Sequence, residues 1–165
     1  MARLAIVPEL DTELEQLYGL PLEEFTGARN ELAARLKKAG QGETGEQVRA
    51  LRKPSVAVWT VNQLARRHPD AVDSLIGSGA SLRAAQSEAF RGRGGDAVRE
   101  ATRAEREALR AVTRLAEQLL AAERRPVGAQ TLERVNATLR AASVDPAAAE
   151  LLRAGRLPDE LESPG

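Results

Sequence analysis

The side chains that most often carry out nucleophilic or metal chemistry are sparse in this sequence. The chain has one histidine, His68, and no cysteine, so neither a histidine pair nor a thiolate can bind a metal or activate a nucleophile. His68 stands between Arg67 and Pro69, and a cation stabilises the carboxyl end of a helix. We therefore expect His68 to end a helix rather than to catalyse a reaction.

Carboxylates are abundant and are candidates for general acid–base work. Glu23 and Glu24, however, lie where a helix is expected to begin, and Glu105 and Glu107 lie among arginines at salt-bridge spacing. No serine stands in a Gly-x-Ser-x-Gly elbow, and the glycine-rich segment 92–95 lacks the Lys-Ser/Thr pair of a phosphate loop. We predict no catalytic, metal-binding or cofactor-binding residue and expect that the protein is not an enzyme.

Arginines recur at steps of three or four residues along the longest predicted helix. This arginine stripe comprises Arg99, Arg103, Arg106, Arg110 and Arg114. It lies opposite the apolar face of the helix and therefore points to solvent or to a partner. Glu100 and Glu107 flank it at salt-bridge spacing, which favours a solvated face. The alternative is sequence-independent nucleic-acid binding, in which Arg49, Arg52 and Lys53 could join the stripe, because guanidinium groups suit bidentate contact with phosphates.

Two amides lie inside apolar helical segments. A buried amide must find hydrogen-bond partners or cost about 1–3 kcal/mol. We expect Asn62 and Asn136 to fix helix packing in this way, and a ligand-binding pair is the alternative.

Residues 46–64 superficially match a helix-turn-helix motif, with Ser55 leading from a basic turn into the second helix. A recognition helix presents polar side chains to base edges, whereas this helix would present Val56, Val58 and Trp59. The turn also lacks a glycine. The sequence therefore does not favour a DNA-binding motif here.

The element that organises the chain is the segment 53–68, KPSVAVWTVNQLARRH, which is apolar on nearly every side of a helix. Pro54 suits its first turn, and Pro69 ends it. A helix without a wide polar face has to be covered by neighbouring elements. The predicted core anchors are Trp59, Phe25 and Asn62.

The remaining apolar residues follow the 3.6-residue period, which predicts about seven or eight helices and no strand. We expect an all-α, single-domain helical bundle over residues 1–156. The helices near 80–91, 96–124 and 129–143 should form its antiparallel core beside the helix at 54–68, with 96–124 as the one long helix.

Most of the predicted turns lie at glycine-rich segments. The segments 40–45, 77–79 and 92–95 are predicted turns, and the last joins two antiparallel helices as a hairpin. The acidic residues 157–165 are predicted to form a flexible C-terminal tail.

The formal net charge is zero, but the charges are unevenly distributed. Residues 1–25 hold six acidic and one basic side chain, whereas residues 26–68 hold nine basic and three acidic ones. We favour an acidic segment that folds against the basic one over the docking of an acidic partner. The apolar run at residues 1–7 is too short for a signal peptide or a membrane span, so a soluble cytoplasmic protein without membrane contact is expected.

Five segments carry a resemblance to a known group of proteins. They are 18–25 (YGLPLEEF), 51–55 (LRKPS), 59–64 (WTVNQL), 79–86 (GASLRAAQ) and 138–140 (TLR). Through them the chain resembles an uncharacterised bacterial family of Ala- and Arg-rich helical proteins with no assigned activity. Some members are longer and have a charged insertion that this chain lacks. The resemblance implies a helical domain and adds no site.

The function that the sequence favours is a non-catalytic helical module that acts through protein contacts. Its partner is an unknown protein or a second copy that associates along the long helix. Weak nucleic-acid binding by the arginine stripe is the alternative.

Overall fold

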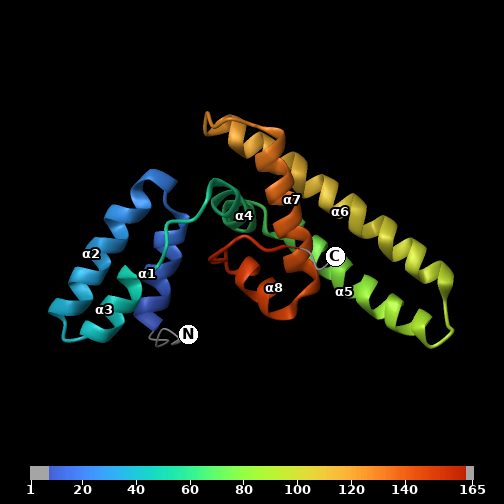
Figure 1. The fold of residues 1–165 in the computed structure, drawn as a ribbon, viewed down its shortest axis with the longest axis horizontal. Helices are drawn as coiled ribbons and strands as arrows, with labels where there is room; N and C mark the ends of the chain where they lie inside the picture. The colour runs from blue at the N-terminus through green and yellow to red at the C-terminus, as the bar shows by residue number, and fades with distance from the viewer. Residues whose placement is uncertain (1–7, 163–165) are drawn as a thin grey trace.

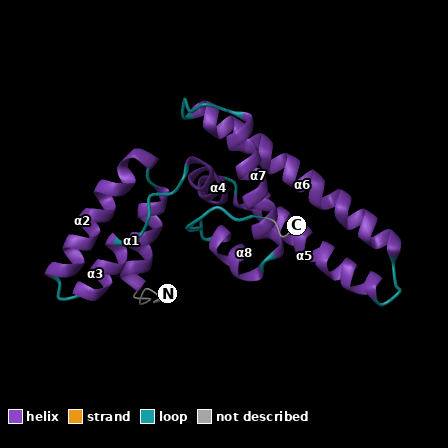
Figure 2. Ribbon diagram, in the orientation of Figure 1, coloured by secondary structure: helices purple, strands orange, loops and turns teal. Residues whose placement is uncertain are grey.

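The computed structural model describes residues 8–162, which form eight α-helices and one short 3-10 helix (Figure 1). No strand occurs within this range (Figure 2), so the predicted all-α fold is confirmed. Residues 1–7, which hold the short apolar run, lie outside the described residues, as do residues 163–165. None of the described helices is long and apolar enough to cross a membrane.

The N-terminal helices form a unit with its own apolar cluster. Its elements are α1 (Pro8–Gly19), the 3-10 turn η1 (Leu22–Glu24), α2 (Phe25–Lys38) and α3 (Gly42–Arg49). Phe25, which is 2% exposed, packs edge-on against Tyr18 with 5.4 Å between ring centroids. The prediction of a turn over 40–45 is wrong beyond Gln41. Gly45 lies inside α3. A Cβ at this position would sit 2.8 Å from the carbonyl oxygen of Ala33, so glycine is needed for α3 to approach α2 this closely.

The central helix α4 (Val56–Arg67) is covered on all sides, as its apolar sequence predicts. Every residue from 57 to 65 is buried. The cap is Ser55, whose hydroxyl accepts a hydrogen bond from the Val58 N–H at 3.2 Å, and Pro54 precedes the helix instead of lying in its first turn. Trp59 is 3% exposed, and its Nε1 donates to the Leu20 carbonyl at 3.0 Å. Helix α4 therefore joins the N-terminal unit to the larger core.

Helices α5 (Pro69–Phe90), α6 (Gly95–Ala122) and α7 (Ala129–Val144) follow as successive hairpins and pack beside α4, and α8 (Pro146–Arg153) closes the core (Figure 1). The predicted turn at 77–79 is wrong, because α5 continues through it. A Cβ on Gly79 would sit 2.4 Å from the carbonyl oxygen of Ser143. The glycine thus serves a close contact between α5 and α7, and not a turn.

The chain does not leave the domain at residue 157 as predicted. Residues 157–162, which we call the C-terminal strap, pack on the helices. Leu157 is 1% exposed, and its backbone N–H and carbonyl both bond to the side chain of Asn62, at 2.9 and 3.0 Å. Hydrogen bonds to both halves of a buried amide hold the segment in place. The expected flexible tail is therefore packed as far as Leu161.

Three of the six acidic residues in segment 1–25 form ion pairs with other described residues. Glu13 pairs with Arg35 of the basic segment at 3.0 Å, which agrees with the internal interpretation of the charge asymmetry. Two further acids pair with arginines of the C-terminal half instead of the basic segment. These pairs are Asp11–Arg156 and Glu23–Arg125.

Candidate interaction site

The distal half of the α5/α6 hairpin projects beyond the other helices (Figure 1). We call residues 80–104 the arm. None of them is buried, because two helices alone cannot enclose a side chain. Phe90, at the end of α5, is 97% exposed and adjoins an apolar surface that includes Ala89 and Val98. An exposed aromatic ring of this kind is a candidate contact for a protein partner.

The turn at the tip of the arm is the hairpin that the glycines predict. Gly92 and Gly94 adopt φ values of +80° and +68°, which non-glycine residues rarely adopt. Gly94 lies directly before α6, and its carbonyl accepts a hydrogen bond from the Ala97 N–H at 3.1 Å. The reversal of the chain therefore depends on these two residues, and it places Phe90 at the outer end of the molecule.

All five members of the arginine stripe are exposed on α6. Arg99 contacts Asp96 at 3.4 Å, and the Nε of Arg110 donates to the Arg106 carbonyl at 3.4 Å. Among the described residues, no carboxylate lies within 4.0 Å of the guanidinium groups of the other four. Those four are Arg103, Arg106, Arg110 and Arg114. Within residues 8–162, most arginines of the stripe thus have no carboxylate partner.

The acids near the stripe differ in their environments. Glu105 faces inward, is 6% exposed, and lies 3.9 Å from the Nε of Arg140 on α7. Glu105 is thus a buried acid with a cation of α7 close to its carboxylate. Glu100 and Glu107 are exposed and form no ion pair with the stripe, although their spacing predicts such pairs.

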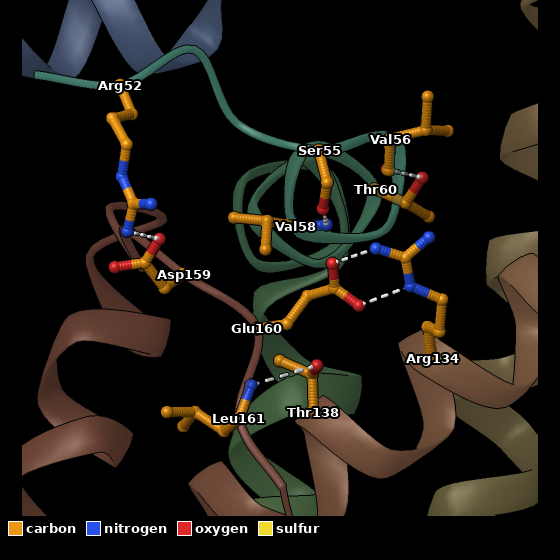
Figure 3. Close-up of polar contacts among 10 residues, drawn as sticks. All are labelled: Arg52, Ser55, Val56, Val58, Thr60, Arg134, Thr138, Asp159, Glu160 and Leu161. Atoms are coloured by element: carbon orange, nitrogen blue, oxygen red, sulfur yellow. Dashed lines mark hydrogen bonds and ion pairs between the residues drawn. The ribbon is translucent and has the colours of Figure 1, made fainter.

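The other basic residues that could extend the stripe are not brought to it. Arg52 pairs with Asp159 of the C-terminal strap at 2.6 Å (Figure 3). Arg49 ends α3 within the N-terminal unit, and Lys53 lies in the linker that leads from this unit to α4 (Figure 1). The burial of residues 57–65 also means that α4 cannot enter a DNA groove, which agrees with the sequence argument against a helix-turn-helix motif.

The two candidate amides do not share a site. Asn62 is 1% exposed and has both hydrogen bonds with Leu157, so it holds the strap and not a neighbouring helix. Asn136 is half-buried and donates to the Thr113 hydroxyl at 3.4 Å, which links α7 to α6. Neither amide is directed at a common cavity, and the ligand-pair alternative gains no support.

The strap itself is held by polar contacts with α7 and the linker (Figure 3), and by the hydrogen bonds between Leu157 and Asn62 of α4. The Leu161 N–H donates to the Thr138 hydroxyl at 3.3 Å, and Glu160 accepts from both Arg134 nitrogens that face it. The Arg134 guanidinium lowers the pKa of the Glu160 carboxyl, with a smaller contribution from the Ser55 hydroxyl. Sequence reasoning missed this segment, because its partners lie far away along the chain.

His68 ends α4 and precedes α5, where its backbone N–H donates to the Leu64 carbonyl at 2.8 Å. This is the position that its neighbours in the sequence predict. Within residues 8–162, no cluster of three or more His, Asp or Glu side chains is arranged to hold a metal ion.

Comparisons with known proteins assign neither a family nor a function to the chain. No protein-family model, curated protein or solved structure matches the chain. The resemblance to an uncharacterised bacterial family therefore stays a prediction.

Proposed function

We propose that the protein is a non-catalytic helical module that binds protein partners through its arm. The observation that carries this proposal is the exposure of the tip. Phe90 is 97% exposed, whereas Trp59, Phe25 and Tyr18 are all buried in the core. A chain with so few aromatic residues presents one of them fully to solvent at the end of a two-helix projection.

The energetics of such a contact are favourable. Full burial of a phenylalanine side chain contributes about 1.5–3 kcal/mol, and aromatic residues at the centre of an interface carry much of its binding energy. The ring is already exposed in the free chain, so a partner can cover it without unfolding any part of the core. Phe90 is therefore the residue whose removal should affect binding most and folding least.

The test is affinity capture from native cells with identification by mass spectrometry, using the unmodified chain, Phe90→Ala and a control. Leu151→Ala is the matched control, because Leu151 is also an exposed apolar residue, at 43%, but lies on α8. We expect partners that Phe90→Ala loses and Leu151→Ala retains, with unchanged melting temperatures for both. The absence of any partner, or equal capture by all three proteins, contradicts the proposal.

Nucleic-acid binding is the second candidate, and the unpaired arginines of α6 favour it. Such binding should weaken steeply with salt, by about 0.9 log unit of affinity per log unit of salt for each phosphate neutralised on duplex DNA. The experiment is a titration of labelled duplex and single strand with the unmodified chain and with Arg103→Glu/Arg106→Glu. If the unmodified chain binds tightly and the double substitution abolishes this binding, nucleic-acid binding becomes the first candidate function. If no binding occurs at low salt, nucleic-acid binding is excluded.

A further inference from the structure

The outward face of α6 carries charged residues at steps of four, three, four, three and four. They are Asp96, Glu100, Arg103, Glu107, Arg110 and Arg114, and all six are exposed. At 100° per residue they form one row opposite the buried positions Val112 and Ala116. Helix α6 runs along the outer edge of the molecule, and none of the elements between residues 8 and 162 covers this row (Figure 1).

Most of the charged residues in this row form no ion pair within residues 8–162. Asp96 contacts Arg99, but the other five residues have no ion-pair partner among the described residues. This holds although Glu100 and Glu107 stand three and four residues from Arg103, the spacing of ion pairs along a helix. A row of both signs, exposed and unpaired, is suited to a surface with the complementary order of charges.

We propose that this surface is the same row on a second copy of the chain, with the two α6 helices antiparallel about a two-fold axis at the level of residue 105. In this register Arg103 lies opposite Glu107 of the second copy. The other opposed pairs are Glu100 with Arg110 and Asp96 with Arg114, and each pair occurs twice by symmetry. Residues at these alternating steps face one another in layers when helices pair in antiparallel fashion.

No other register of the row gives this match. A shift by one heptad places Asp96 opposite Glu107 in one direction and Arg103 opposite Arg114 in the other. A parallel arrangement places each charge opposite itself. Like charges across a contact disfavour these alternatives, so the order of charges on α6 specifies both the orientation and the register.

The proposal rests on the protein-contact function above and names a second copy as one partner. The opposed side chains are long and solvated, so each ion pair contributes little and is screened by salt. The dimer should therefore form at high protein concentration and low salt, and dissociate as the salt concentration rises. The tip with Phe90 lies outside the paired row and stays available to another protein.

The test is sedimentation velocity over a concentration series at low and high salt. The variants are Arg103→Glu, Glu107→Arg, the double exchange of both, and the control Arg49→Glu, which makes the same charge change on α3. We expect each single reversal to weaken dimerisation at least about tenfold, because it places like charges opposite each other twice in the symmetric dimer. The double exchange should restore dimerisation, because positions 103 and 107 then again oppose each other across the axis with opposite charges. An equimolar mixture of the two single variants should also dimerise, since their faces are complementary.

Three outcomes would refute the proposed dimer. The first is an unmodified chain that stays monomeric at every concentration, even at low salt. The second is a double-exchange variant that dimerises as weakly as the single variants. The third is an Arg49→Glu variant that dimerises as weakly as Arg103→Glu. The proposed function survives such a failure if Phe90→Ala still loses a captured partner. Circular dichroism melting of every variant establishes that each one folds.

Discussion

Substitution by alanine should stabilise the protein at one glycine of α5 and destabilise it at another. Gly77 and Gly79 both lie inside the helix, and in an open helix interior Gly→Ala stabilises by about 0.8–1.0 kcal/mol. At Gly77 a new Cβ meets no atom within 4 Å, so the full gain should appear. For a chain of this size, about 1 kcal/mol corresponds to a rise of roughly 2–4 °C in melting temperature.

At Gly79 the same methyl group meets the α7 backbone. The new Cβ would lie 2.4 Å from the Ser143 carbonyl oxygen and 2.9 Å from its carbonyl carbon. Relief requires the two helices to separate by about an ångström, and overpacking of this kind costs about 1–3 kcal/mol. Because the contact is with backbone atoms, which cannot rotate away, we take the cost as about 3 kcal/mol, the upper end of this range. The helix-propensity gain of about 1 kcal/mol offsets part of it. Gly79→Ala should therefore destabilise by about 2 kcal/mol, or roughly 4–8 °C.

The measurement is thermal and urea denaturation of both variants, followed by far-UV circular dichroism. If 77–79 were a turn, both glycines would be adapted to it and both substitutions would destabilise. A lower melting temperature for Gly77→Ala would thus refute the continuous helix. A Gly79→Ala variant as stable as Gly77→Ala would refute the close contact between α5 and α7.

Three further substitutions test the core and the strap. Trp59→Ala should cost about 3–5 kcal/mol, and the fluorescence of this single tryptophan should be protected from polar quenchers, because the ring is 3% exposed. Asn62→Ala leaves the buried backbone groups of Leu157 without partners, so denaturation should show a loss of at least about 2 kcal/mol and hydrogen exchange should accelerate over 157–162. The pKa of Glu160 is lowered by Arg134, so their pair contributes stability above the ordinary carboxyl pKa and loses it as pH falls through the lowered value. Glu160→Gln should therefore flatten the acid limb of the stability profile, and an unchanged limb would show that the strap is held without this pair.

Most of the helices could be predicted because their evidence is local. The apolar residues of α4 and α6 recur at the helical period, and the proline and glycine boundaries follow from backbone chemistry. The same local logic failed at Gly45 and Gly79. A glycine that ends a helix and a glycine that admits a neighbouring backbone look alike in the sequence, and only the packing partner distinguishes them.

The partners of the polar residues could not be predicted, because they are distant in sequence. Asn62 stands out as a polar residue in an apolar segment, but its partner lies 95 residues away. The arginine stripe was predictable from its spacing alone. The absence of ion pairs between the stripe and Glu100 or Glu107 could not be predicted. Residue spacing permits an ion pair, but it does not specify the side-chain rotamers that form one.

The pairing of Asn62 with Leu157 also constrains how the protein can be made. Helix α4 leaves the ribosome long before residue 157 does, and until then its amide has no backbone partner and part of its apolar surface has no cover. A nascent chain that stalls within α7 or α8 therefore exposes the same features that chaperones and proteases recognise in unfinished proteins. The core around α4 is thus fully covered only after residues 157–162 have been synthesised.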